Sequence, residues 1–233
     1  TMRPTSIMLF AAGFGTRMGE MTQTQPKPLL MVGDRCLIDH ALALAKGAGL
    51  DNIVVNLHYL GAQIQAHLAT SGIQFSWETP AILETGGGLK QARPMLGDQP
   101  VFTLNTDAVW GNQNPLLALA DHWDPEEMDA LLLLVPVTKA IGHRGTGDFV
   151  MDKTGRIARA HGATGFVYVG AQIIKTEPLE EIHEQSFSLN LLWDRFIAKG
   201  RLYGVLYEQF WCDVGTPQGI ALAEETLKAA QDV

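Results

Sequence analysis

Short apolar runs alternate with segments of helical periodicity over the first 140 residues of the chain. The runs have the length of buried strands, and between them apolar residues recur every three or four positions, as on a helix that covers a sheet. The pattern predicts strands at Ser6–Phe10, Asn52–Leu57, Gln74–Trp77, Val101–Leu104 and Ala130–Val137. It predicts helices at Cys36–Ala48, Leu60–Ala69, Gly87–Met95 and Leu116–His122. Strands that alternate with amphipathic helices imply βαβ units and a mostly parallel sheet with helices on its faces.

The pattern changes near residue 140, where glycines separate shorter apolar runs. This region predicts strands at Asp148–Met151, Phe166–Val169 and Leu202–Leu206, and helices at Leu189–Ala198 and Pro217–Ala230. No Ser/Gly-rich linker separates the two regions, so we expect a single domain over residues 1–233. Its expected parts are about 1–140, a second lobe of about 141–216, and a closing helix of 217–233.

The composition excludes several classes of protein. With 46% apolar and 18% charged residues, the chain can bury a core and does not have the composition of a disordered protein. Its formal net charge of −8 disfavours broad binding to nucleic acid, and no apolar run approaches the ~20 residues of a membrane span. Cys36 and Cys212 form no CxxC motif and are expected to be reduced thiols. We therefore expect a cytoplasmic monomer or homodimer without nucleic-acid or membrane partners.

The first predicted strand leads into a loop that combines glycines with nearby cations. Gly13 and Gly15 follow the strand directly, so the backbone can turn tightly and bring N–H groups close to a phosphate chain. Arg17 and Lys27 supply cations for polyphosphate oxygens, and prolines on both sides of Lys27 restrict its backbone. Glycines after a strand also serve for turning alone, so the loop by itself leaves a structural role open.

Other common site motifs do not occur in the sequence. It has neither the GxGxxG of dinucleotide-binding folds nor the Gly-Lys-Ser/Thr of a Walker loop, and it lacks GxSxG and HExxH. The seven histidines are scattered without the spacing of metal ligands. His40 and His67 lie on predicted helices, where surface or core roles are expected.

Two polar segments follow predicted strands or extended runs. Glu84 and Thr85 precede three glycines at the start of a helix, where they could read the polar edge of a base while the glycines leave room for a flat ring. Asp107 follows a buried strand, at the sheet edge where open α/β folds bind ligands. Asp213 lies among bulky apolar residues, where a carboxylate needs a partner. With the cationic loop, the two aspartates suggest Mg²⁺ held by few protein oxygens and by substrate phosphates.

The order of these segments resembles that of the sugar-1-phosphate nucleotidylyltransferases. The motifs are LFAAGFGTRM from Leu9, PKPL from Pro26, ETGGG from Glu84, the Asn105–Asp107 strand end and WCDVGT from Trp211. The likeness spans nearly the whole chain and is greatest to the bacterial N-acetylmuramate 1-phosphate uridylyltransferases of cell-wall recycling. It implies a Rossmann-like nucleotide-diphospho-sugar transferase fold with a small sugar-binding lobe. It also implies transfer of a nucleotidyl group from an NTP, expected to be UTP, to a sugar 1-phosphate, expected to be N-acetylmuramate 1-phosphate, with Mg²⁺.

The resemblance assigns roles to individual residues. Catalytic roles fall to Arg17, Lys27 and Asp107, and metal binding to Asp107 and Asp213. The nucleotide is expected to contact Ala11, Ala12, Gly13, Gly15, Thr16, Arg17, Lys27, Glu84, Thr85, Gly86 and Asn105. Gly147 and Asn190 are expected to face the sugar.

Three positions depart from the pattern of that family. Phe14 replaces a lysine between the loop glycines, Thr106 replaces a glycine, and Cys36 replaces a proline. Phe14 and Thr106 could change substrate preference or lower activity, which leaves two alternatives open. One is a guanylyltransferase that acts on mannose or heptose 1-phosphate, and the other is a non-catalytic nucleotide-sugar binding protein. A cytidylyl- or molybdopterin-type transferase would share the glycine loop but would not need WCDVGT.

Overall fold

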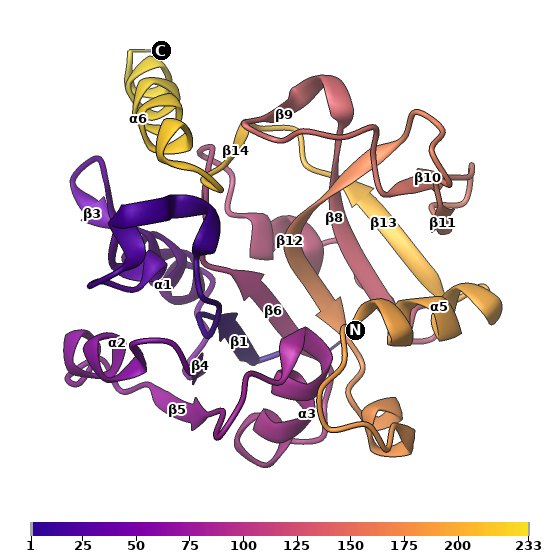
Figure 1. Cartoon of the computed structure of the whole chain (residues 1–233). Coiled ribbons are helices and arrows are strands. Elements are labelled where there is room, and N and C mark those ends of the chain that lie inside the picture. Colours follow the sequence, from indigo (N-terminus) through magenta and orange to yellow (C-terminus); the bar gives the residue numbers. More distant parts are fainter. Residues whose placement is uncertain (1, 233) are drawn as a thin grey trace.

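The computed structural model describes residues 2–232 and has a mixed sheet at its centre (Figure 1). Its strand order is β5 (Gln74–Trp77), β4 (Asn52–Leu57), β1 (Ser6–Phe10), β6 (Val101–Asn105), β12 (Phe166–Ile174), β8 (Ala130–Pro136) and β13 (Leu202–Leu206). These strands run parallel except β12, which pairs antiparallel with both β6 and β8. The carboxyl ends of the parallel strands therefore lie at one edge of the sheet.

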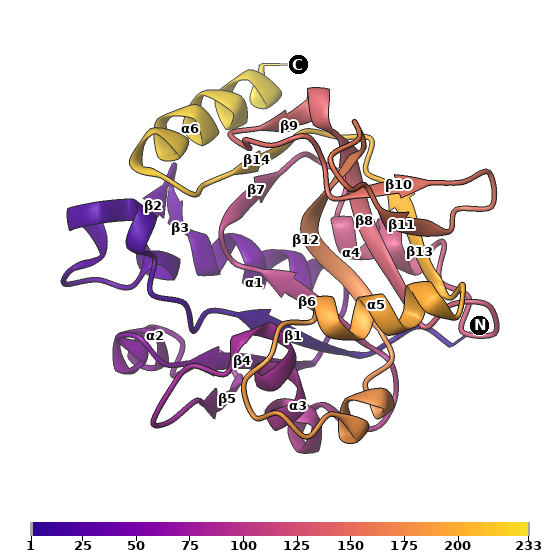
Figure 2. The same cartoon turned by 45° about the vertical axis from the view of Figure 1, so that its right-hand side comes forward.

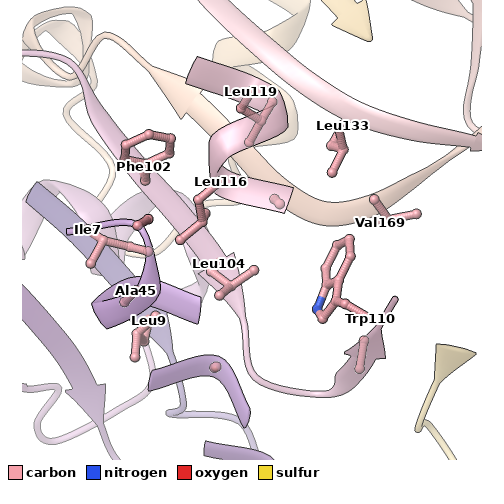
Figure 3. Close-up of a cluster of buried hydrophobic side chains, with 14 of the residues drawn as sticks. Ile7, Leu9, Ala45, Phe102, Leu104, Trp110, Leu116, Leu119, Leu133 and Val169 are labelled. Carbon is pink, nitrogen blue, oxygen red and sulfur yellow. The ribbon is translucent and has the colours of Figure 1, made fainter. Parts of the chain in front are cut away.

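Helices cover both faces of this sheet because side chains alternate along each strand. One face packs against α1 (Leu37–Gly47), α2 (Gly61–His67) and α4 (Pro115–Ala120), and the other against α3 (Glu84–Leu96) and α5 (Asn190–Ala198). In β1, Ile7 and Leu9 belong to the first layer, whereas Met8 belongs to the second. Figure 3 shows Ile7 and Leu9 close to Ala45 of α1 and Leu116 of α4. The two buried layers hold the carboxyl ends of β1, β4 and β6 in fixed positions.

A second, smaller sheet brings distant parts of the sequence to the end of β6. Its strands are β7 (Ala108–Trp110), β14 (Trp211–Asp213) and β9 (Ala140–Ile141), in the order β7-β14-β9. Asp213 of β14 lies opposite Ala108 in the antiparallel β7–β14 pair. The last helix, α6 (Pro217–Gln231), packs on this sheet through Val214 and Ala223, at the opposite end of the molecule from α3 (Figure 2). The segment before α6 is thereby held next to Asp107.

The remaining elements are short. Two strands, β2 (Met31–Val32) and β3 (Arg35–Cys36), form a hairpin, and β10 (Phe149–Met151) joins β11 (Ile157–Arg159) to the start of β12. In the described part of the chain, 3₁₀ helices occupy Thr16–Thr22, Lys27–Leu29, Val137–Lys139 and Glu177–Glu181. The first two follow β1 and contain the predicted cationic residues Arg17 and Lys27.

The fold class predicted from the sequence is confirmed, with two informative differences. Helix α3 begins at Glu84, three residues earlier than predicted, so the glycines form its first turns. Strand β12 continues to Ile174 instead of ending at Val169, because residues 171–174 pair with β6 and residues 172–174 with β8. Gly170, with a φ of 85°, lies at an irregularity in the pairing with β8. Strands β12 and β13 come from residues 141–216, the region expected to form the second lobe, but they lie in the central sheet. The division of the chain into these parts stays a prediction. No helix within residues 2–232 combines the length and apolar character needed to cross a membrane.

Candidate functional site

A cleft of about 340 Å³ opens at the carboxyl ends of β1, β4 and β6. Each strand contributes a lining residue near that end: Phe10, Asn56 and Asn105. Among the predicted site residues, the lining includes Ala11, Ala12, Gly13, Gly15, Thr16, Arg17, Lys27, Glu84, Thr85, Asn105 and Asp107. The volume lies in the range of small-molecule sites, and open α/β sheets bind ligands at this edge.

The glycine loop and the PKPL segment pack closely at the floor of the cleft. Gly15 has a φ of 63°, and a Cβ on it would lie 3.0 Å from the Cβ of Lys27, so only glycine fits this turn. Thr22 fastens the loop by donating its hydroxyl to the carbonyl of Gly15 at 2.9 Å. Arg17 reaches the segment after β14, where a Cβ on Gly215 would lie 3.0–3.1 Å from the guanidinium. The two cations are therefore positioned by close backbone approaches.

The two aspartates converge next to these cations. The main-chain N–H of Val214 donates to the carbonyl of Asp107 at 2.8 Å, which ties the segment after Asp213 to the strand end. The Asp107 carboxylate lies 3.6 Å from the Lys27 ammonium. Burial, together with the charge of Asp107, raises the pKa of Asp213, and the charges of Lys27 and Arg17 oppose this rise. Two carboxylates whose charges interact at the cleft edge are a suitable donor set for a divalent cation, so the residues fit Mg²⁺.

We expect Asp213→Asn to raise the melting temperature of the unliganded protein near neutral pH. The raised pKa means that ionisation of Asp213 costs folding free energy above that pKa, and the neutral amide avoids this cost. Below the unfolded-state pKa of about 3.9 both side chains are uncharged, so the difference should disappear as the pH falls towards that value. Calorimetry of both proteins across this pH range measures the effect, and a variant that melts below the wild type at neutral pH would contradict it.

Two cleft residues that the sequence did not single out, Asn56 and Glu78, form a buried polar network. Glu78 is 0% exposed and accepts from Asn56 Nδ2 and from the N–H of Leu83, both at 2.8 Å. Asn56 Oδ1 in turn accepts from the N–H of Ala11 at 2.6 Å. The network joins the glycine loop to the segment before α3 across the floor of the cleft. The sequence signal that could have identified them is a polar residue at the end of each run: Asn56 in Asn52–Leu57, and Glu78 directly after Gln74–Trp77.

The glycines of the ETGGG segment accommodate protein atoms. A Cβ on Gly86 would lie 2.3 Å from the Phe187 ring, and one on Gly88 would lie 2.6 Å from Glu78 Oε2. The N–H groups of Gly86 and Gly87 both donate to the carbonyl of Phe187, at 2.9 and 3.1 Å. These glycines were expected to leave room for a flat ligand ring, but protein atoms fill that space. Gly86, which was expected to contact the nucleotide, is not among the residues that line the cleft.

Three other predicted residues also lie outside the lining. Asp213 is two residues before Gly215, which lines the cleft. Gly147 packs against Gly165, where a Cβ would lie 2.8 Å from the carbonyl carbon. Asn190 is exposed in the first turn of α5, and its side-chain amide donates to Ser188 at 2.9 Å. The roles of Gly147 and Asn190 towards a sugar stay predictions.

Two of the unusual positions have structural explanations. The Phe14 ring, 44% exposed, lies 5.4 Å from His58 and 5.5 Å from Tyr59 between centroids, so it fastens the glycine loop to the segment after β4. The hydroxyl of Thr106 donates to the carbonyl of Phe10 at 2.7 Å and is 5% exposed as a residue. The hydroxyl of Thr106 is therefore already hydrogen-bonded to the end of the neighbouring strand β1.

The chain is similar to known nucleotidyltransferases in sequence and in fold. Residues 7–145 match the family model described as the MobA-like NTP transferase domain. The N-acetylmuramate alpha-1-phosphate uridylyltransferase of Caulobacter vibrioides is 39% identical over 97% of this chain and 98% of its own length. The enzyme of that name from Neisseria meningitidis serogroup B is 33% identical over 90% of this chain and 92% of its own.

Solved structures share the fold at lower identity. HddC from Yersinia pseudotuberculosis, complexed with GMP-PN, is 20% identical, with a TM-score of 0.76 over 97% of this chain and 100% of that one. A putative glucose-1-phosphate thymidylyltransferase from Bacillus anthracis is 16% identical, with a TM-score of 0.78 over 98% of this chain and 96% of that one. The family model, which covers more than half of the sequence, and the relative at 39% identity show that the chain belongs to the MobA-like NTP transferase family.

Proposed function

We propose that this protein transfers a uridylyl group from UTP to N-acetylmuramate 1-phosphate and releases pyrophosphate. An oxygen of the sugar phosphate bonds to the α-phosphorus of UTP. The bond from that phosphorus to the oxygen that joins it to the β-phosphorus breaks, and this oxygen leaves with the pyrophosphate. The proposal is supported by the electrostatic interaction of Asp213 with three cleft residues, Asp107, Arg17 and Lys27. The choice of base and sugar rests on the names of the two relatives above 30% identity.

The reaction requires the protein to position the two substrates and to neutralise the negative charge of their phosphates. The attacking phosphate oxygen is already ionised, so no protein base is required. Arg17 and Lys27 would bind the triphosphate oxygens, and the close approaches at Gly15 and Gly215 hold both cations towards the cleft. Asp107 and Asp213 would hold Mg²⁺, which when bound neutralises charge on the triphosphate and on the leaving pyrophosphate. Such preorganised contacts act in a site whose geometry is set before the substrates arrive.

A second candidate is guanylyl transfer to mannose 1-phosphate. A probable mannose-1-phosphate guanylyltransferase of Arabidopsis thaliana is 28% identical over 95% of this chain and 65% of its own length. The base and the sugar are therefore the features that need a direct test.

The test pairs each of the four NTPs with the 1-phosphates of N-acetylmuramate, mannose, glucose and glucosamine, in Mg²⁺. Pyrophosphate release and the mass of the nucleotide sugar are measured. We expect UTP with N-acetylmuramate 1-phosphate to exceed every other pair in kcat/KM by about tenfold or more. A preference for GTP with mannose 1-phosphate supports the second candidate. Binding of nucleotide without pyrophosphate release from any pair contradicts both, and unchanged turnover after chelation of divalent cations contradicts the role of Mg²⁺.

A further inference from the structure

Three potential metal ligands meet in a hollow that shares no lining residue with the cleft. Cys36 ends strand β3, Asp39 lies in the first turn of α1, and His67 ends α2. The Cys36 side chain is buried, whereas the side chains of Asp39 and His67 are 34% and 39% exposed. The fold thus brings residues from two separate helices and a hairpin to one point that solvent reaches.

The ligand atoms of these residues lie close to one another. His67 Nε2 is 2.9 Å from Asp39 Oδ2 and 3.6 Å from Cys36 Sγ, and Sγ is 3.2 Å from the same carboxylate oxygen. Tetrahedral zinc has bonds of about 2.0 Å to nitrogen or oxygen and about 2.3 Å to sulfur, so its ligand atoms stand roughly 3.3–3.6 Å apart. The three measured distances come within a few tenths of an ångström of one triangular face of such a site. Small side-chain shifts would therefore admit the ion.

The pattern of contacts argues against a nucleophilic role for Cys36. In a Cys-His-Asp arrangement, the cysteine contacts one ring nitrogen and the aspartate orients the ring through the other. Here the sulfur and the carboxylate both approach Nε2 of His67. Convergence of sulfur, nitrogen and oxygen on a common point is the geometry of a metal site.

We propose that Cys36, Asp39 and His67 bind a transition-metal ion, with Zn²⁺ the best match to this donor set. Thiolate and imidazole ligands favour Zn²⁺ over Mg²⁺, which prefers oxygen alone. The hollow leaves a fourth position for water or another small ligand. The cation at the rim, Arg35, has its own acidic partner in Asp34, at 3.4 Å. A bound ion would join the start of α1 to the end of α2.

The test uses Co²⁺ as a probe, because cobalt bound to a thiolate absorbs in the near ultraviolet. Titration of the purified, metal-free protein should produce this band at one ion per chain. Cys36→Ser should abolish it. Cys212→Ser is the matched control, because Cys212 neighbours Asp213 and would report cobalt held in the cleft instead. The wild-type band should persist in Cys212→Ser.

Calorimetric titration with Zn²⁺ gives a second readout that does not depend on Cys36. His67→Gln and Asp39→Asn should each weaken Zn²⁺ affinity about tenfold or more, since even residues that only orient ligands have effects of about 10–100-fold. His183→Gln, at an exposed histidine, should bind as the wild type does. Both ligand changes are at partly exposed side chains, so they decide the matter if Cys36→Ser does not fold.

The proposal is overturned if the wild type shows no thiolate band, or if the band survives Cys36→Ser. It is also overturned if His67→Gln and Asp39→Asn both bind Zn²⁺ as tightly as the wild type. Turnover enters neither measurement, so the outcome is separate from the success or failure of the proposed uridylyl transfer.

Discussion

Asp107→Asn is expected to lower the rate of pyrophosphate release by about 10²–10³ while the fold stays intact. The Asp107 side chain is 38% exposed at the cleft, and the bond from Val214 uses its main-chain carbonyl, which the substitution keeps. The amide removes one of the two carboxylate charges that would hold Mg²⁺ in the proposed site, and it also removes the anionic partner of Lys27. Steady-state release of pyrophosphate from UTP and N-acetylmuramate 1-phosphate measures the loss.

A matched control separates this effect from a general change of charge. Asp51→Asn removes an exposed carboxylate at the amino end of β4, away from the carboxyl-end cleft, and should leave turnover unchanged. Circular dichroism and the melting temperature should be close to the wild type for both variants. If the defect of Asp107→Asn lies in metal binding, a higher Mg²⁺ concentration should recover part of the rate. Turnover at the wild-type rate would remove Asp107 from the mechanism.

The sequence was sufficient for the layers of the fold because those layers follow from local patterns. Buried runs such as Ser6–Phe10 and Asn52–Leu57 have the bounds predicted for them, since apolar length and flanking turns define a strand without reference to its neighbours. Asp107 was predicted at a ligand edge for the same reason: it directly follows a buried strand. Its proximity to Asp213 depends on the pairing of β7 with β14, about 100 residues apart, which no local pattern contains.

The features that sequence analysis missed are long-range contacts between polar or small residues. The glycines after Thr85 predicted space for a ligand, but packing decided that Phe187 and Glu78 occupy it. His67 was assigned a surface or core role because no metal-ligand spacing surrounds it. Its neighbours Cys36 and Asp39 are about 30 residues earlier and reach it only through the packing of α1 and α2 on one face of the sheet. Such sites follow from the topology and not from a motif.

Glu78→Gln is expected to raise the KM for UTP about tenfold or more. Glu78 accepts two hydrogen bonds, from Asn56 Nδ2 and the N–H of Leu83, whereas the new amide offers one oxygen and one NH₂ group. In either orientation two donors face each other in a buried site, at a cost of about 1–3 kcal/mol. If Asn56 turns to relieve this, it presents its own NH₂ to the N–H of Ala11. The strain therefore reaches the glycine loop that lines the cleft.

A second substitution should repair the network. Asn56→Asp, combined with Glu78→Gln, supplies a carboxylate that accepts both from the N–H of Ala11 and from the new amide, so every donor regains an acceptor. We expect the double variant to recover most of the KM and of the melting temperature lost in Glu78→Gln. Asn56→Asp alone should be impaired, because its carboxylate faces that of Glu78 in a buried site. A double variant no better than the worse single variant would show that the network does not set the position of the loop.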